Sequence, residues 1–309
     1  MKIIYGIGGV KKPFKKAVLA IGVFDGLHRG HQILIQRAIR EARKIQGEAV
    51  VMTFFPHPVN VLHPEINLPL IVSLKHRLKL LADLGVDACL VIHFTKSFSR
   101  LTPEQFIQRY LLNGIRPKEI FVGDDFRFGQ NRTGTLDYFQ EVGKHFGFKV
   151  NIVQSTRGGQ KTASSTSIRQ LISEGNLSRV GQLLGRRVSI MGTVTKGEAR
   201  GQTLGYPTAN IDPEGLVIPP LGVYAVYVMI GPKKFSGMAN VGVRPSFKSH
   251  NNRVNVEVHI FNFHKNLYSR EIVIEFIKKI RDEKFFNTKE KLIQQLEQDE
   301  HEIKSFFRR

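Results

Sequence analysis

The first half of the chain alternates short apolar runs with longer segments whose apolar residues recur at helical spacing. The short runs, rich in β-branched and aromatic residues, predict strands at 17–24, 49–55, 88–94, 119–122 and 149–154. The longer segments predict helices at 33–45, 76–84, 103–112 and 136–146. Strands that alternate with helices in this way predict an α/β domain, with a parallel sheet covered on both faces.

The pattern changes near residue 186. Two short helices are predicted just before it, at 167–173 and 178–184. Short strand-like segments then follow at 188–194, 222–230, 234–241, 254–261 and 271–277, and a charged amphipathic helix at 288–307. Short strands separated by turn residues predict an antiparallel barrel or sandwich. We therefore predict two domains, 1–185 and 186–309, as expected at roughly 150 residues per domain.

The composition of the chain limits the kinds of partner and compartment that we expect for it. Lys and Arg number 46 against 26 Asp and Glu, a formal net charge of +20. This excess attracts phosphate, whether in nucleic acid, an anionic membrane or nucleotide substrates, and it is equally compatible with an ordinary basic surface. The single cysteine, Cys89, excludes a disulfide scaffold and favours a reducing, cytoplasmic compartment. No apolar run approaches the ~18 residues of a membrane helix, so no membrane partner is expected.

A first candidate site joins the first predicted strand to the first predicted helix. There Gly26 and Gly30 allow the backbone to approach a ligand closely, and a helix N-terminus attracts phosphate. His28 and His31 are spaced to face one ligand and to hydrogen-bond its phosphate oxygens. The alternatives are structural histidines or a metal pair, which would want a third ligand. Neither a Walker A nor a G-x-G-x-x-G pattern occurs, so the segment predicts a different type of mononucleotide site.

Three further stretches extend this candidate site. At 164–169, hydroxyl side chains at a helix start and one arginine suit a polyphosphate, although an ordinary N-cap fits the hydroxyls alone. His57, between two prolines at a strand end, is either a turn residue or a ligand contact. Phe126 and Phe128, after another strand end, suit a planar ring ligand or a packed core.

Together these segments resemble the adenylyltransferase module of bacterial bifunctional riboflavin kinase/FAD synthetases, over roughly residues 15–184. The resemblance implies a Rossmann-like nucleotidyltransferase fold for this domain, with His28 and His31 as catalytic residues. For ATP it implies Gly22, Phe24, Asp25, His28, His31, Ser164, Ser165, Thr166 and Arg169. For FMN it implies His57, Asp125 and Arg127. Ala163 stands where this family often has a larger aliphatic residue.

A second candidate site lies in the glycine-rich stretch 192–210. A flexible hairpin there, with basic residues such as Arg200, suits a phosphate chain, although a plain basic loop has the same composition. Thr208 and Asn210 are two residues apart, so on an extended segment they share a face. Neutral oxygens together with substrate phosphates are ligands that Mg²⁺ prefers. Glu257, amid an apolar strand, is either a solvent-facing residue or a base that accepts a proton from an attacking hydroxyl.

This half resembles the riboflavin kinase module of the same enzymes, over roughly residues 186–305. The resemblance implies an antiparallel six-stranded β-barrel with a C-terminal helix, Glu257 as catalytic base, and Mg²⁺ bound by Thr208 and Asn210. For ATP it implies Gly197, Arg200, Gly201, Thr208 and Asn210, and for the flavin Arg281 and Glu283. Departures from the family pattern are Ser246, Asn262 and Ser269, none of them at the three key positions.

The resemblance implies two reactions: ATP-dependent phosphorylation of riboflavin to FMN, and adenylylation of FMN to FAD with release of pyrophosphate. It implies Mg²⁺ as cofactor and flavins and nucleotides as partners. We expect no specific nucleic acid partner, and a monomer or weak oligomer. One alternative is another nucleotidyltransferase with the β-unit as a binding module. The other is a nucleic-acid-binding protein, which the scattered placement of Lys and Arg disfavours.

Overall fold

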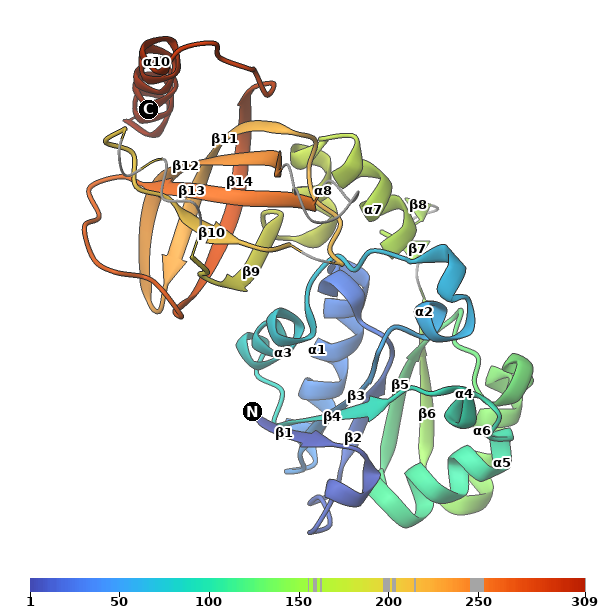
Figure 1. The fold of residues 1–309 in the computed structure, drawn as a ribbon. Helices are drawn as coiled ribbons and strands as arrows, with labels where there is room; N and C mark the ends of the chain where they lie inside the picture. The colour runs from blue at the N-terminus through green and yellow to red at the C-terminus, as the bar shows by residue number, and fades with distance from the viewer. Residues whose placement is uncertain are drawn as a thin grey trace. The chain divides into compact units, whose positions relative to one another are not determined.

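The computed structural model describes residues 1–154, 156–157, 160–161, 163–196, 201, 204–213, 215–244 and 253–308. The chain divides into two compact units (Figure 1). The first comprises Met1–Leu70 and Leu74–Ser165, and the second Ile71–Ser73 and Thr166–Arg309. The helices α7 (Ser165–Ser173) and α8 (Leu177–Leu184) therefore group almost entirely with the second unit. The assignment of activities to 1–185 and 186–309 stays a prediction.

The first unit is built on a parallel sheet, as predicted, which has six strands in the order β1-β4-β3-β2-β5-β6. Its strands are β1 (Lys2–Tyr5), β2 (Val18–Ile21), β3 (Ala49–Phe55), β4 (Ala88–His93), β5 (Glu119–Gly123) and β6 (Lys149–Val153). All four residues of β2 are buried, because a central parallel strand is covered on both faces. The edge strand β1 was not predicted, and its pattern is mostly exposed.

Helices cover both faces of this sheet. They are α1 (Arg29–Lys44), α2 (Pro58–Leu62), α3 (Leu74–Asp83), α4 (Lys96–Ser99), α5 (Pro103–Phe106), a π-type continuation at Ile107–Ile115, and α6 (Leu136–Phe146). Single helical turns lie at Ile7–Gly9, Asp25–Leu27, Pro64–Ile66 and Gln130–Arg132. A short hairpin pairs β7 (Thr156–Arg157) with β8 (Gln160–Lys161).

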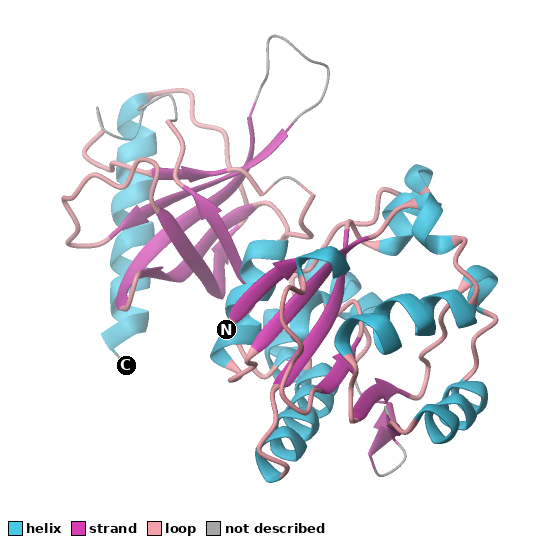
Figure 2. Ribbon diagram, turned by 90° about the horizontal axis from the view of Figure 1, so that it is seen from below, coloured by secondary structure: helices cyan, strands magenta, loops and turns pink. Residues whose placement is uncertain are grey.

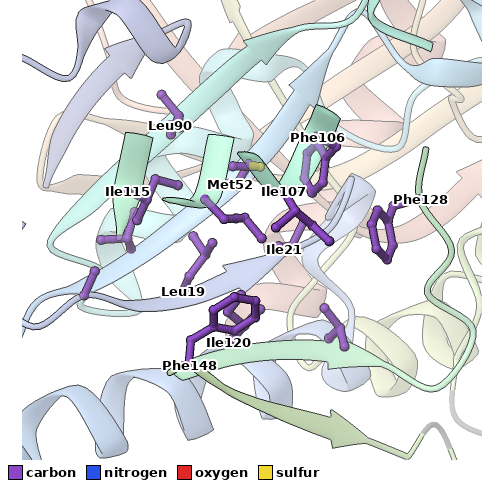
Figure 3. Packing of buried hydrophobic residues seen from close by; sticks show 14 of the residues in the cluster. Leu19, Ile21, Met52, Leu90, Phe106, Ile107, Ile115, Ile120, Phe128 and Phe148 are labelled. Atoms are coloured by element: carbon purple, nitrogen blue, oxygen red, sulfur yellow. The ribbon is translucent and has the colours of Figure 1, made fainter. Parts of the chain in front are cut away.

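Alternation along the strands divides the core of this unit into two layers. Leu19 and Ile21 of β2 face a cluster built with Phe106, Ile107 and other residues of α5 and its continuation (Figure 3). The intervening β2 residues face a second cluster, formed with apolar residues of α1 and α3. Because successive strand residues point to opposite faces, one sheet serves both clusters. Packing on both faces of the sheet thereby holds the carboxyl ends of its strands in place along one edge.

The second unit is a nearly closed antiparallel barrel of six strands, followed by a C-terminal helix (Figure 2). The strand order is β10-β13-β12-β11-β14-β9. The elements are β9 (Ser189–Thr193), β10 (Ala209–Ile211), β11 (Gly222–Ile230), β12 (Lys233–Arg244), β13 (Arg253–Ile260), β14 (Glu271–Arg281) and α10 (Lys289–Arg308). A bridge between Thr195 and Asn210 links the two ends of the sheet, which decides for a barrel over a sandwich. The three-residue β10 was not predicted.

Candidate active sites

The first site is a cavity of about 700 Å³ at the carboxyl ends of β2, β3 and β5. In a parallel sheet this is the edge where ligands bind. Eight of the residues predicted for ATP or FMN line it: Gly22, Phe24, Asp25, His31, His57, Asp125, Arg127 and Ser165. The structure therefore brings together segments that lie up to about 140 residues apart, and Ser165 Oγ donates a hydrogen bond to the Asp25 carbonyl at 3.1 Å.

The turn that leads from β2 into α1 has a backbone that few residues adopt. Phe24 has φ 54° and Gly26 has φ 78°, both in the left-handed region. The Phe24 ring is buried against Gly22, where an added Cβ would come within 2.9 Å of the ring. Two glycines thus permit a tight turn that directs the following helix N-terminus toward the cavity.

His28 and His31 form one stacked unit at that N-terminus. Their ring centroids lie 3.6 Å apart at an interplanar angle of 20°. His28 is the N-cap of α1, because its Nδ1 accepts the backbone N–H of His31 at 3.3 Å. An Nδ1 that accepts carries no proton, so the ring proton of neutral His28 is on Nε2. The cap therefore leaves Nε2–H as the donor available to a ligand.

Burial keeps both rings neutral near pH 7. It lowers the pKa of His28 from 6.5 to about 4, and the charge of Asp25 opposes this only in part. The pKa of His31 is held well below its ordinary value, first by burial and then by His28 and the cation of Arg77. At neutral pH the pair therefore offers N–H donors and carries no positive charge.

Arg77 of α3 was not predicted as part of this site, although it is fully buried. Its Nη1 donates to the carbonyl of Val23 at 2.9 Å, and lies 3.3 Å from both Thr53 Oγ1 and the Phe54 carbonyl. Its Nη2 lies 3.8 Å from Asp25 Oδ1. One guanidinium therefore joins the ends of β2 and β3. The only signal in the sequence was an arginine inside a predicted helix, which is typical of an exposed face.

Aromatic rings form one wall of the same cavity. The rings of Phe54, Phe94, Phe98, Phe106, Phe126 and Phe128 line it, with neighbouring centroids 5.3 to 6.3 Å apart. The sequence left open whether Phe126 and Phe128 face a ligand or pack in the core. In the structure they do both, because they line the cavity and also pack with the hydrophobic core. His57 likewise caps α2 and lines the cavity. His63 and Arg132 also line it and were not predicted.

Four residues predicted for ATP are not part of this cavity lining: His28, Ser164, Thr166 and Arg169. Ser164 is exposed, and Thr166 and Arg169 belong to α7 in the second unit, where Arg169 is buried. Their contacts with a nucleotide in the first site stay predictions.

The second site is a cavity of about 540 Å³ in the barrel unit. Six predicted residues line it: Gly201, Thr208, Asn210, Glu257, Arg281 and Glu283. Gly197 and Arg200 lie outside the described residues. Strand register builds the floor of the cavity, because Glu257 of β13 pairs with Asn210 of β10 on one side and with Asn240 of β12 on the other. Three polar residues therefore form one row across three strands.

Side-chain contacts tie this row to the segment before β10. Thr208 Oγ1 lies 3.5 Å from Glu257 Oε2. Asn255 Nδ2 donates to Asn210 Oδ1 at 2.8 Å and to Glu257 Oε1 at 3.2 Å. Asn240 and Asn255 were not predicted. In the sequence, the only sign of Asn255 was a polar residue two positions before Glu257, and Asn240 was a polar residue in another predicted strand. Both patterns are also typical of a strand surface that faces solvent.

Arg281 lines this cavity while its guanidinium is held by α10. Its Nε lies 3.0 Å from both carboxylate oxygens of the buried Asp299, and its Nη2 lies 2.8 Å from Asp299 Oδ2. The residue therefore joins the end of β14 to the C-terminal helix, and its predicted flavin contact stays a prediction. The Glu283 carboxylate lies over Gly242, in space that a larger residue there would occupy.

The donor set of the second site suits a cation shared with a nucleotide. Among the described residues, no group of three or more His, Cys, Asp or Glu is arranged to hold a metal ion. Thr208, Asn210 and Glu257 supply a hydroxyl, an amide and a carboxylate oxygen. Mg²⁺ prefers such oxygens and takes its remaining ligands from water and substrate phosphates. The residues present therefore fit Mg²⁺ only in company with a phosphate ligand.

Comparison with known proteins relates both halves to flavin enzymes. The FAD synthetase family model matches residues 10–167, and the riboflavin kinase family model matches residues 184–307. Two proteins named bifunctional riboflavin kinase/FMN adenylyltransferase, from Buchnera aphidicola (subsp. Schizaphis graminum) and Escherichia coli K12, are each 38% identical over 309 residues. The alignments cover 99% of this chain and 99% and 98% of those proteins. The chain belongs to the family of bifunctional riboflavin kinase/FMN adenylyltransferases.

The family resemblance drawn from the motifs is thereby confirmed, and so is the fold that it implied. A solved structure named as a macrolide-efflux protein from Streptococcus pneumoniae has the same architecture, with a TM-score of 0.81 and 32% identity. The match covers 97% of this chain and 98% of that one. The shared fold therefore includes both units of this chain. Within the described ranges, no helix has the length and apolar character to cross a membrane.

Proposed function

We propose that this member of the family makes FMN from riboflavin and ATP in the barrel unit, and FAD from FMN and a second ATP in the α/β unit. The observation that carries the proposal is the presence of two separate cavities with different donor sets. One offers stacked neutral histidines beside a helix N-terminus. The other offers a carboxylate flanked by amide and hydroxyl oxygens.

In the barrel unit, Glu257 is the general base. Its carboxylate accepts the proton of the 5′-hydroxyl of riboflavin as that oxygen attacks the γ-phosphorus of ATP. An O–P bond forms, the bond from the γ-phosphorus to the bridging oxygen breaks, and ADP leaves. The row of Asn210, Glu257 and Asn240 supports this role, because it places the carboxylate on the cavity floor. Arg281 and Glu283, which line the same cavity, would contact the flavin.

Thr208 and Asn210 would hold Mg²⁺ in this site through Oγ1 and Oδ1. The ion, when bound with ATP, supplies positive charge against the transferring phosphoryl group. The residues themselves orient the phosphate chain. Thr208 stands 3.5 Å from the proposed base, so the phosphate and the hydroxyl nucleophile meet in one place. Gly201, and in the predicted assignment Gly197 and Arg200, would contact the ATP phosphates.

In the α/β unit, the phosphate of FMN attacks the α-phosphorus of ATP. A new O–P bond forms, the α–β bridge breaks, and pyrophosphate leaves. His28 and His31 donate hydrogen bonds to the charged oxygens, which is effective because the donors are buried and fixed before the reaction. The aromatic wall suits the flavin ring, with His57, Asp125 and Arg127 nearby. FMN is itself the nucleophile, so no covalent enzyme intermediate is needed.

The remaining assignments rest on composition and family. We infer a cytoplasmic enzyme, which a chain with one cysteine among 309 residues suits. We also infer a monomer or weak oligomer that uses Mg²⁺ and has no specific nucleic acid partner.

Product analysis tests the proposal. Purified chain is incubated with riboflavin, ATP and Mg²⁺, and flavins are separated by chromatography over time. We expect FMN to appear first and FAD to follow, with ADP and pyrophosphate as the two coproducts. FMN supplied in place of riboflavin should give FAD and pyrophosphate without ADP. If the chain adenylylates FMN but does not phosphorylate riboflavin, the proposed kinase activity is contradicted, and the barrel unit is a binding module instead.

A further inference from the structure

Three side chains on one face of β13 contact the segment that precedes and forms β10. Asn255, Glu257 and His259 alternate along the strand and so point the same way. His259 Nδ1 lies 2.9 Å from the carbonyl oxygen of Pro207, and Glu257 Oε2 lies 3.5 Å from Thr208 Oγ1. The two reactions proposed above use Glu257 of this row, but neither Asn255 nor His259.

Asn255 bridges two groups that those reactions do use. Its Nδ2 donates to Asn210 Oδ1 at 2.8 Å and to Glu257 Oε1 at 3.2 Å. A primary amide nitrogen carries two hydrogens, so both are engaged. The bond to the carboxylate is charge-assisted, which makes it stronger than a neutral one.

The two hydrogen bonds fix which atoms face the cavity. If the Asn210 amide were turned by 180°, its N–H₂ group would face the N–H₂ group of Asn255, and two donors cannot form a hydrogen bond. The hydrogen bond therefore selects the orientation in which Asn210 Oδ1 points toward β13. On Glu257, the bond engages Oε1 and leaves Oε2 as the oxygen nearest Thr208. Gly242 is opposite Asn255 in the register and lines the same cavity. Asn255 therefore stands in the cavity lining itself.

We propose that Asn255 is a positioning residue of the kinase site. Its amide holds the oxygen of Asn210 and the carboxylate of Glu257 in one fixed relation, so that cation and base act on the same phosphoryl transfer. This rests on the proposed function, in which Asn210 binds Mg²⁺ and Glu257 is the base. Asn255 acts through these two residues and touches no reacting atom.

A series of variants of the full chain separates the effect of the Asn255 hydrogen bonds from the effect of side-chain size. Asn255→Ala removes both hydrogen bonds and should lower kcat/KM of riboflavin phosphorylation roughly 10- to 100-fold. Asn255→Asp keeps the shape but replaces the donor by an acceptor beside two acceptors, so its loss should be at least as large. Asn255→Gln keeps the donor and should recover part of the rate. Asn266→Ala is the matched control, because this exposed amide contacts only the backbone N–H of Tyr268 among the described contacts.

Two readouts accompany the rates. Formation of FAD from supplied FMN reports folding and the unchanged α/β unit, and should stay at the parent value in every variant. Mn²⁺ binding in the presence of ADP, followed by electron paramagnetic resonance, reports the cation site without turnover. Because the α/β unit is the same in all variants, a change in Mn²⁺ binding reports the barrel unit. We expect about 10-fold weaker binding in Asn255→Ala and Asn255→Asp, and recovery in Asn255→Gln.

The inference is overturned if Asn255→Ala keeps the parent kcat, KM for Mg·ATP and Mn²⁺ affinity. It is also overturned if Asn255→Asp keeps the parent activity, since the shape of the side chain without its N–H donors would then be sufficient. Glu257→Gln is measured alongside. If it loses kinase activity while Asn255→Ala does not, the proposed function stands and the positioning role falls. If Glu257→Gln stays active, the assignment of the base fails and the positioning role fails with it.

Discussion

The two sites are assembled by different means. In the α/β unit, three segments distant in sequence meet because parallel strand ends share one edge, and the buried Arg77 joins two of them. In the barrel unit, the row Asn210, Glu257 and Asn240 follows directly from antiparallel register. The first site therefore depends on loop conformations held by one buried cation. The second site depends on the pairing of adjacent strands, which sets the position of each side chain.

This difference also separates the chemistry. The α/β site presents stacked histidines kept neutral by burial, so it provides fixed N–H donors. The floor of the barrel site presents hydroxyl, amide and carboxylate oxygens, which suit a cation and a proton acceptor. Each site fits one type of phosphorus chemistry, and damage to one should leave the other working.

The largest expected effect comes from removing the proposed base. Glu257→Gln keeps the size of the side chain but cannot accept the proton of the riboflavin hydroxyl, so the initial rate of FMN formation should fall about 10²- to 10⁴-fold. FAD formation from supplied FMN should be unchanged. Both rates are measured by chromatography on one preparation. Kinase activity above a few per cent of the parent value would remove Glu257 as the base.

The converse change is His31→Ala. Loss of one preorganised donor should slow FAD formation from FMN by about 10²- to 10³-fold. Riboflavin phosphorylation should continue at the parent rate and FMN should accumulate. The same chromatographic assay measures both steps. Equal loss of the two reactions would contradict two independent sites.

The dependence of the α/β unit on one buried cation can be tested with two arginines. Arg77→Met removes a fully buried partner of Asp25 and should lower the free energy of unfolding of this unit by about 3 kcal/mol or more. Arg43→Met is the matched control. Arg43 pairs with Asp87 at 2.7 Å, but both side chains are partly exposed at 52% and 31%, so about 0.5 kcal/mol is expected.

Urea titration, monitored by FAD formation from FMN and by far-UV circular dichroism, measures the unfolding of that unit. Riboflavin phosphorylation serves as the internal reference, because the barrel contacts are unaffected. Similar losses for both arginine variants would show that burial of Arg77 adds nothing to the site.

The smallest expected effect is on pH dependence. The folded-state pKa of His28 is about 4, below its ordinary 6.5, so the folded chain binds fewer protons than the unfolded chain between these values. Stability is therefore complete above pH 6.5 and falls toward pH 4, by at most about 3 kcal/mol for this group. His28→Asn retains a capping side chain and should reduce the fall. Urea titrations at pH 7.5 and 4.5 measure it, and equal falls in parent and variant would contradict the assignment.

The sequence predicted the layers of the fold because its strands and helices have clear periods. It missed β1, since Ile3 and Tyr5 are exposed on an edge strand, and it missed β10, which has only three residues. The motifs led to the family, which the comparisons confirm, and most of the residues that they implicated line one of the two cavities. The roles of those residues in catalysis stay predictions.

The missed site residues share a physical cause. Arg77 and Asn255 are polar residues in a helix and a strand, where a sequence pattern favours solvent-facing positions. Their function depends on what the tertiary structure places opposite them: two strand ends for Arg77, and Asn210 with Glu257 for Asn255. Register and strand order, which create those contacts, are not local properties of the chain.

Complementation between two defective chains tests the central claim most directly. Glu257→Gln and His31→Ala chains are each incubated with riboflavin, ATP and Mg²⁺, then mixed, and FAD is quantified by chromatography. Two independent sites predict almost no FAD from either chain alone, and restored FAD from the mixture as FMN released by one chain reaches the other. A mixture that produces no more FAD than its separate components, although the His31→Ala chain releases FMN and the Glu257→Gln chain converts added FMN, would contradict that claim.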